Sequence, residues 1–173
     1  MRGTADTEIL PVCREAEIAR TAALARTIWR EHYLPIIGER QVEYMLETVQ
    51  SPAAIAGQIR EGSNYFLMLS DGIDAGYFAL VRKADAVMLS KLYVERAHRH
   101  SGMGIEAVAF AESYCRAHGA ATLWLTVNKN NASAVAWYER RGFVIAGPLV
   151  QDIGQGYVMD DYRMEKVISS EKR

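Results

Sequence analysis

The sequence has 173 residues and a mass of 19.3 kDa, the size of one domain that buries a core without disulfides or metal. Lysine plus arginine total 20 against 21 for aspartate plus glutamate, so the formal net charge is -1. This balance argues against nucleic acid and anionic membranes as partners, and the 50% hydrophobic content argues against disorder. We therefore expect a single domain over residues 1–173.

Two cysteines, Cys13 and Cys115, are too few for a disulfide framework, and no Cys/His cluster has the spacing of a zinc site. We expect two reduced thiols and no bound metal. The N-terminal residues lack the apolar segment of a signal peptide, and no run of 18 apolar residues predicts a membrane helix. These features predict a cytoplasmic protein.

The first part of the chain changes from a strand pattern to a helix pattern. An apolar run at residues 8–13 predicts a strand, and apolar residues at helical spacing from Glu15 onward predict a long helix. Further helices are predicted at residues 38–50 and 52–60, the second with Ser51 as its N-cap.

Three strands are predicted next, at residues 65–70, 76–83 and 86–94. The connections between them are short, and the first contains the turn-forming pair Asp71-Gly72. Consecutive strands joined so closely must pair antiparallel.

The second part of the chain alternates helix and strand. Its predicted elements are a polar loop at residues 95–104, a helix at about 105–118, a strand at 122–127, a helix at 131–141, and strands at 143–150 and 156–168. A strand-helix-strand crossover places strand 86–94 parallel to strand 122–127. The sequence thus predicts a mixed α/β sheet whose first strands are antiparallel.

The first motif that carries chemistry is Arg99-His100-Ser101-Gly102-Met103-Gly104, between a strand and a helix. Its glycines let backbone N–H groups approach a ligand, and a helix start offers free donors and a positive dipole end. Arg99 and His100 would add charge-assisted contacts. The motif fits a phosphate or pyrophosphate, and a tight turn into a helix is the structural alternative.

Residues 102–107 also fit the loose dinucleotide pattern G-x-G-x-x-A. In that pattern the strand runs almost directly into the first glycine, whereas seven residues, Glu95 to Ser101, intervene here. Asn128 and Lys129 stand where a ribose-binding carboxylate would be needed. These differences argue against a nicotinamide cofactor.

The second motif runs from Asn131 to Tyr138 and closes with Arg141-Gly142-Phe143. On a helix that begins at Asn131, residues 131, 134, 138 and 141 share one face. The structural alternative is an asparagine N-cap, a core aromatic pair and a glycine C-cap.

Together, and in this order, the two motifs resemble the GNAT superfamily of acyl-CoA-dependent N-acyltransferases. The matching residues are Arg99, Gly102 and Gly104 of R/Q-x-x-G-x-G/A, Leu92-Tyr93-Val94 in place of L-x-V, and Asn131, Ala134, Tyr138, Gly142 and Phe143 of N-x-x-A-x-x-x-Y with its G-F pair. The resemblance covers essentially the whole chain. The ending MDDYRMEK and the segment IWREHY look like a bacterial branch described as polyamine-type or small-amine acetyltransferases.

The resemblance implies a GNAT fold, a largely antiparallel mixed sheet splayed at a central parallel pair, with helices on both faces and acetyl-CoA in the gap. It implies three sets of contacts to this co-substrate. They are Leu92, Tyr93 and Val94 with the pantetheine amides, Arg99, His100, Ser101, Gly102, Met103, Gly104 and Ile105 around the pyrophosphate, and Asn131, Ser133 and Tyr138 along the pantetheine arm and the sulfur.

The resemblance also implies the reaction, in which an amine attacks the thioester directly within a ternary complex. Tyr138 would protonate the departing thiolate, because a phenol ordinarily titrates near 10 and donates at neutral pH. The backbone N–H of Val94 would stabilise the oxyanion. The acceptor would be a small primary amine or a peptide N-terminus. A non-catalytic acyl-CoA-binding module of the same fold is the alternative.

The base that deprotonates the acceptor is not identified by any motif. Glu31, His32 and Glu95 are candidates, and Glu31 comes first because its helix commonly lines the acceptor channel in the family. A solvated surface role is the alternative for each of them, and a water chain is equally allowed. Some polyamine-type members carry carboxylates shortly before L-x-V, where this chain has Ser90 and Lys91.

The basic residues 96–100 fit phosphate recognition better than nucleic-acid binding. Within this stretch, His98 and His100 would need further ligands to hold a metal.

The pair Asp160-Asp161 is interpreted as part of the last strands, with attraction of a cationic acceptor as the alternative. The resemblance also implies a homodimer paired through the late strands.

Overall fold

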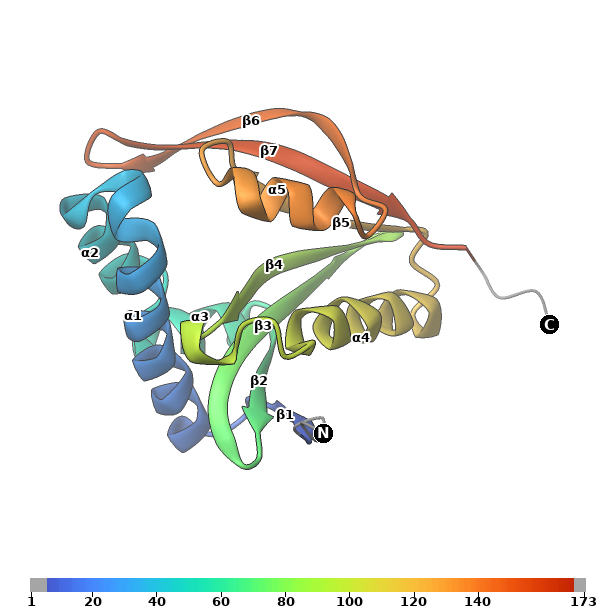
Figure 1. Ribbon diagram of the computed structural model, residues 1–173, viewed down its shortest axis with the longest axis horizontal. Coiled ribbons are helices and arrows are strands. Elements are labelled where there is room, and N and C mark those ends of the chain that lie inside the picture. The colour runs from blue at the N-terminus through green and yellow to red at the C-terminus, as the bar shows by residue number, and fades with distance from the viewer. Residues whose placement is uncertain (1–5, 170–173) are drawn as a thin grey trace. The chain divides into compact units, whose positions relative to one another are not determined.

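The computed structural model describes residues 6–169. The strands form one mixed sheet in the order β1-β2-β3-β4-β5-β7-β6, so the predicted α/β class is confirmed. The elements are β1 (Thr7–Pro11), α1 (Glu15–Ile37), α2 (Glu39–Thr48), α3 (Pro52–Arg60), β2 (Asn64–Ser70), β3 (Ile73–Lys83), β4 (Ala86–Val94), the short 3-10 helix η1 (Arg96–His98), α4 (Met103–Ala117), β5 (Thr122–Asn128), α5 (Ala132–Glu139), β6 (Val144–Gly154) and β7 (Tyr157–Val167) (Figure 1).

The chain divides into two compact units, which are described separately. The first contains the residues up to Val81 together with Lys91–Phe110, and the second contains Arg82–Ser90 and the residues from Ala111 onward. The boundaries fall inside β3, β4 and α4, so each of these elements belongs partly to both units. The single domain over residues 1–173 stays a prediction.

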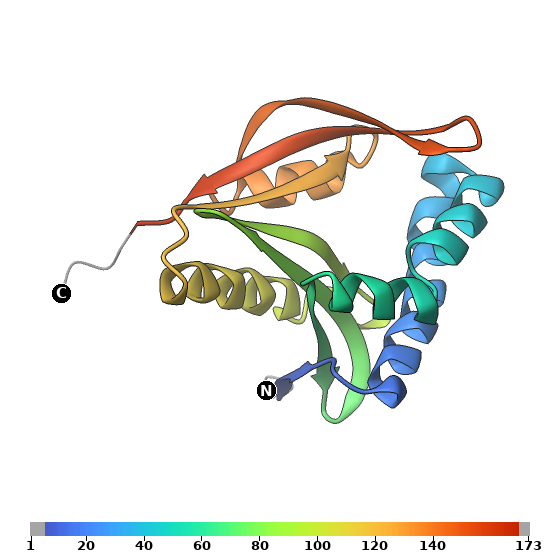
Figure 2. The same cartoon turned by 180° about the vertical axis from the view of Figure 1, so that it is seen from behind.

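The sheet of the first unit begins as an antiparallel meander. β1 pairs with β2 and β2 pairs with β3, and the second of these pairings was predicted from the short connection between the two strands (Figure 2). Asp71 and Gly72 both have positive φ, 49° and 79°, which is the two-residue turn that matches the twist of a hairpin. Pairing therefore resumes at once, with Ile73 opposite Ser70, and β3 begins earlier than the predicted residue 76.

β3 has helices packed against both of its faces. Two adjacent residues of β3, Tyr77 and Phe78, are fully buried. Their side chains point to opposite faces, since side chains alternate along a strand. On one side, the ring of Tyr93 lies 5.3 Å from that of Tyr77 and 5.5 Å from that of Trp29 on α1. On the other side, the ring of Phe110 on α4 lies 5.5 Å from that of Phe78.

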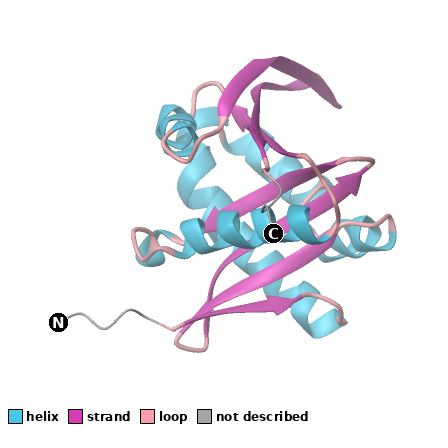
Figure 3. Ribbon diagram, turned by 90° about the vertical axis from the view of Figure 1, so that its right-hand side faces the viewer, coloured by secondary structure: helices cyan, strands magenta, loops and turns pink. Residues whose placement is uncertain are grey.

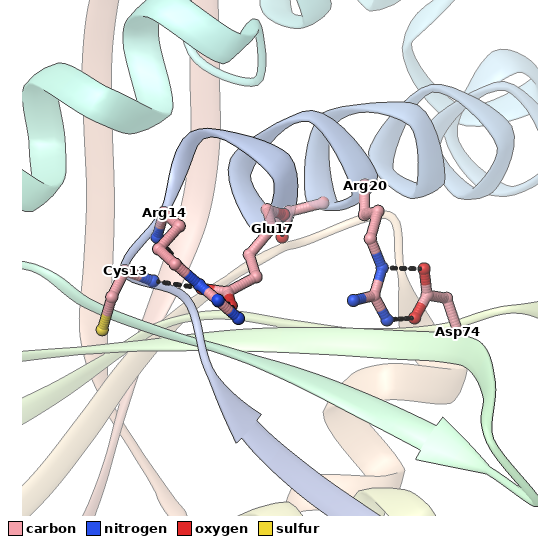
Figure 4. Close-up of polar contacts among 6 residues, drawn as sticks. Cys13, Arg14, Glu17, Arg20 and Asp74 are labelled. Carbon is pink, nitrogen blue, oxygen red and sulfur yellow. Dashed lines mark hydrogen bonds and ion pairs between the residues drawn. The ribbon is translucent and has the colours of Figure 1, made fainter.

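The start of α1 is fixed by Glu17 (Figure 4). Its Oε2 accepts the N–H groups of Cys13 at 2.8 Å and Arg14 at 3.0 Å, and its Oε1 accepts Nη2 of Arg14 at 2.6 Å. These hydrogen bonds, led by the one from Cys13, lower the pKa of Glu17 from 4.5 to about 2. The carboxylate thus occupies N–H groups that a helix start leaves without intrahelical partners.

We expect Glu17→Gln to reduce thermal stability by a few degrees at pH 7, because the amide replaces a charged acceptor with a neutral one. A lowered carboxyl pKa stabilises the fold above the unfolded value of 4.5, and this contribution is lost as the pH falls towards about 2. The melting temperatures of the wild type and of Glu17→Gln should therefore approach each other as the pH falls from 5 to 2. A difference of constant size across this range would contradict the role given to the Glu17 carboxylate.

The second unit is built on β5 and the long hairpin of β6 and β7 (Figure 3). β5 pairs with β7 over all seven of its residues, from Thr122 to Asn128. The parallel register with β4 covers only three pairs, from Ala86 opposite Thr122 to Met88 opposite Trp124. The predicted parallel pair is confirmed. Its register includes neither the residues of β4 after Met88 nor those of β5 after Trp124.

Other features of the described residues bear on the predictions. Cys13 and Cys115 are free thiols, as expected. No helix within residues 6–169 combines the length and apolar character that crossing a membrane requires. The predicted polar loop 95–104 contains the turn η1, and α4 begins at Met103 rather than at residue 105.

Candidate functional site

The glycine motif forms a sharp turn between β4 and α4 in the first unit. His100 and Gly102 both have positive φ, 65° and 95°. The left-handed region is disfavoured for residues other than glycine, and such strained residues concentrate at ligand-binding segments. A Cβ on Gly102 would meet no atom within 4 Å, so this glycine is needed for its backbone conformation rather than for space.

Side chains of the turn hold it to the end of β4. Nε of Arg99 donates to the carbonyl of Val94 at 3.2 Å, and the hydroxyl of Ser101 donates to the carbonyl of His98 at 2.6 Å. Met103 is 1% exposed and anchors the first turn of α4. The structure therefore brings together the end of the L-x-V segment and the residues predicted for the pyrophosphate.

The donors of this turn suit an anion. The first intrahelical bond of α4 runs from the N–H of Glu106 to the carbonyl of Gly102 at 3.1 Å. The N–H groups of Met103, Gly104 and Ile105 precede it, at the positive end of the helix dipole. A pyrophosphate accepts hydrogen bonds from such a set, so these residues fit the diphosphate of a coenzyme A.

The strand end Leu92–Val94 is held by an irregularity in β3. Met68 pairs with Gly76 and Leu69 with Asp74, which leaves Ala75 as an extra, bulged residue. The carbonyl of Ala75 accepts the N–H of Glu95 at 2.7 Å. Gly76 lies against the same strand end, because a Cβ there would be 2.6 Å from the carbonyl oxygen of Tyr93. Sequence reasoning missed Gly76, although a glycine inside a strand signals such close approach.

The second motif lies in the second unit, on α5. Oδ1 of Asn131 accepts the N–H of Ala134 at 3.3 Å and the hydroxyl of Ser133 at 3.2 Å, so the predicted N-cap is present. The ring of Tyr138 meets those of Trp137 and Phe143 edge-on, with centroids 5.0 and 5.5 Å away. One helix thus carries Asn131, Ser133 and Tyr138 in fixed positions. Their roles at the pantetheine arm and the sulfur stay predictions.

The three candidate bases have different surroundings in the first unit. Glu31 is exposed on α1. The ring of His32 lies 4.8 Å from that of Tyr33, and Glu95 lies 3.7 Å from Nε2 of His98. Glu95 is therefore tied to the glycine turn. Their assignment as base stays a prediction.

Lys91 is a half-buried cation that sequence reasoning did not assign to any site. Its Nζ donates to Oε1 of Gln58 at 3.0 Å, and the hydroxyl of Tyr65 donates to the same oxygen at 2.6 Å. Burial lowers the pKa of Lys91 to about 8. A lysine in an otherwise apolar strand was the available signal.

Asp161, which the sequence analysis interpreted as part of the last strands, is a second buried ionisable group. It is 4% exposed, and within residues 6–169 its Oδ1 has no hydrogen-bond partner. Burial is the main cause that raises its pKa to about 6, while a hydrogen bond from Thr126 acts in the opposite direction. A purely structural aspartate would be expected to have both oxygens satisfied.

Metal ligation has no support among the described side chains. Within residues 6–169, no three or more histidine, cysteine, aspartate or glutamate residues gather in a way that could hold a metal ion. His98, one of the two histidines considered for a metal, pairs with Glu95 instead.

Three comparisons relate the chain to known proteins. Streptothricin acetyltransferase of Streptomyces lavendulae is 30% identical over 93 residues, which cover 53% of this chain and 49% of that protein. An uncharacterized N-acetyltransferase of Lactobacillus delbrueckii subsp. lactis is 25% identical over 137 residues, covering 74% and 79%. The chain thus spans about half the length of the first relative and most of the second.

A solved structure shows the same fold. The paia N-acetyltransferase from Thermoplasma acidophilum, in complex with coenzyme A, superposes with a TM-score of 0.79 at 20% identity, covering 94% of this chain and 99% of that one. The family model of the acetyltransferase (GNAT) domain matches residues 33–166. Because this match covers more than half of the sequence, the chain belongs to the GNAT acetyltransferase family.

Proposed function

We propose that this protein transfers an acetyl group from acetyl-CoA to the primary amine of a small molecule or to a peptide N-terminus. The observation that carries the proposal is the anchored turn from Arg99 to Ile105. It combines two left-handed residues, an arginine tied to Val94 and the free N–H groups of a helix start. These donors and the positive charge of Arg99 suit the negatively charged oxygens of a pyrophosphate.

The rest of acetyl-CoA is assigned to the two other predicted sets of residues. Backbone groups of Leu92, Tyr93 and Val94 bind the pantetheine amides as an added strand does. The register of β4 with β5 covers only its first three residues, which supports this role. Asn131 and Ser133, at the start of α5, contact the pantetheine arm.

The chemistry is a direct attack of the amine nitrogen on the thioester carbonyl carbon. The carbon–nitrogen bond forms while the backbone N–H of Val94 stabilises the oxyanion, and the carbon–sulfur bond then breaks. Tyr138 gives its proton to the departing thiolate and regains one from solvent. The chain's residues bind and orient the reactants and move protons, and no covalent enzyme intermediate is needed.

Lys91 bears on the acceptor. Some polyamine-type relatives carry carboxylates where this chain has Ser90 and Lys91, and a cation there opposes a second positive charge on the acceptor. A small amine with one cationic group near the reacting nitrogen is therefore favoured over a polyamine. The name of the streptothricin acetyltransferase is consistent with a small-molecule acceptor.

The proposal is tested by following thiol release from acetyl-CoA in the presence of spermidine, L-lysine, kanamycin or triglycine. Amine-dependent release, with the acetylated product seen by mass spectrometry, supports it. Acetyl-CoA should also stabilise the protein thermally, since a ligand at 100 times its Kd contributes about 2.7 kcal/mol. Stabilisation without turnover on any amine would favour the non-catalytic acyl-CoA-binding module.

We expect Arg99→Ala to weaken acetyl-CoA binding by roughly 10- to 100-fold, since a charge-assisted hydrogen bond contributes about 1.5–3 kcal/mol. Calorimetric titration measures the change. Arg116→Ala is the control, because Arg116 is an exposed arginine in the last turn of α4, outside the glycine motif. Equal loss in both variants would indicate general charge attraction instead of a contact made by Arg99.

A further inference from the structure

The carboxylate of Asp161 has an oxygen that nothing in the described protein explains. The residue lies on β7 and is 4% exposed, and within residues 6–169 Oδ1 receives no hydrogen bond. Leaving a buried acceptor unsatisfied costs about 1–3 kcal/mol. Such an oxygen lacks a donor that the described residues do not supply.

Asp161 lies at the foot of the helix that carries Tyr138. It pairs in register with Asn128, the last residue of β5. The carbonyl of Asn128 accepts the N–H of Asn131 at 2.9 Å, and Asn131 caps α5. From this cap to Tyr138 the helix rises roughly 10 Å. The pairing of β7 with β5 thus places Asp161 opposite the start of the segment Asn128–Tyr138, which carries the proposed acid.

Among the described residues, the basic groups nearest to Asp161 in the sequence and the sheet are paired with other carboxylates. Nζ of Lys129, on the loop after β5, lies 2.6 Å from Oδ1 of Asp160 and is neutralised there. On β6, the residue opposite Asp161 is the uncharged Leu149. On β7, Arg163 is paired with Glu165 at 2.7 Å.

Burial makes this carboxylate a stronger base than an ordinary aspartate. Its pKa is raised to about 6, chiefly by burial and further by Asp160, while Thr126 and Lys129 act in the opposite direction. At pH 7 to 8 the group is mostly ionised. A base with a pKa near the working pH combines the reactive form with useful proton affinity.

We propose that Oδ1 of Asp161 receives the ammonium group of the acceptor and takes its proton, directly or through one ordered water. The inference rests on the proposed acetyl transfer and specifies its acceptor as a primary amine that is protonated at neutral pH. It replaces Glu31 as the leading base, and it adds proton transfer to the attraction of a cationic acceptor that the sequence left as an alternative for Asp160-Asp161.

Each proton of the proposed reaction has a donor and an acceptor. The ammonium R–NH₃⁺ gives one proton to the Asp161 carboxylate, and the resulting amine attacks the thioester carbon. The nitrogen of the tetrahedral adduct loses a second proton to solvent as the carbon–sulfur bond breaks, and the thiolate takes one from Tyr138. Tyr138 is reprotonated by solvent and Asp161 releases its proton, so one net proton is freed for each acetyl group transferred.

The test compares Asp161→Asn with the wild type in pH profiles of kcat/KM, using the most active of spermidine, L-lysine, kanamycin and triglycine. Wild-type activity should fall below about pH 6 as Asp161 is protonated. The variant should lose about 100-fold at pH 7, within the range of general-base catalysis. Its activity should recover steadily towards pH 9, where bulk base deprotonates the amine.

Two more variants separate this role from a structural one. Glu139→Gln alters an exposed carboxylate at the end of α5 and should stay within 3-fold of wild type, while Asp161→Glu should restore part of the activity together with an acidic limb. Acetyl-CoA affinity, measured by calorimetry, should be unchanged in Asp161→Asn and shows that this variant is folded. If it does not fold, the profile of Asp161→Glu decides, because a shifted acidic limb supports the role and an unshifted one overturns it.

The outcomes distinguish the two proposals. A wild-type profile in Asp161→Asn, with the same acidic limb, overturns the assignment of Asp161 and leaves acetyl transfer intact. Absence of transfer by the wild type to all four amines overturns the proposed function, and the role of Asp161 falls with it. The wild type alone therefore tests the proposed function, whereas the variants test the role of Asp161.

Discussion

Replacing Tyr138 with phenylalanine is expected to lower kcat for acetyl transfer by a factor of about 10²–10⁴, the range of a lost general acid. The substitution removes only the hydroxyl, so the edge contacts of the ring with Trp137 and Phe143 remain. Binding of acetyl-CoA should therefore be unchanged. Thiol-release kinetics and calorimetric titration measure the two effects separately.

Tyr114→Phe serves as the control for this substitution. Tyr114 lies on α4, where its ring stacks on that of His118 with centroids 4.0 Å apart, and it is assigned no part in the reaction. Turnover of this variant should match the wild type. Unchanged turnover in Tyr138→Phe would remove Tyr138 from the mechanism and leave the thiolate to be protonated by water.

Gly76→Ala is expected to destabilise the protein by about 1–3 kcal/mol, the usual cost of overpacking. The added Cβ would lie 2.6 Å from the carbonyl oxygen of Tyr93 and 2.7 Å from Cε of Met68. The methionine end moves easily, whereas the strand backbone does not. Urea unfolding at constant pH measures the loss of stability.

The same substitution should also weaken acetyl-CoA binding, because relief of the contact displaces Tyr93 and Val94, which are assigned to the pantetheine. Gly147→Ala on β6 is the matched control, since a Cβ there meets nothing within 4 Å. It should leave both stability and affinity unchanged. Wild-type stability in Gly76→Ala would show that the two strands separate at little cost.

The parts of the fold that follow from local signals were predictable. β4 and α3 have the predicted bounds, because turn residues border the strand and Ser51 caps the helix with a hydrogen bond to the N–H of Ala54. The glycine motif was found for the same reason, since its chemistry lies within six consecutive residues. Its anchoring through Arg99 to Val94 joins residues only five apart.

The groups that sequence reasoning missed depend on contacts between distant segments. Lys91 meets Gln58, which is 33 residues away in the chain. Asp161 follows an exposed aspartate of the same type, and only the pairing of β7 with β5 and β6 determines that one of the two is buried. The partners of either residue become known only when the strands and helices around it are placed.

The interleaved division of the chain has a consequence for biosynthesis. The first unit needs Lys91–Phe110, and these residues follow the segment Arg82–Ser90, which belongs to the second unit. A growing chain therefore cannot complete the first unit until residue 110 has left the ribosome, although domains commonly fold from the N-terminus during synthesis. By then β3 and the first half of β4 have already been synthesised, so both wait for the segment that completes the first unit.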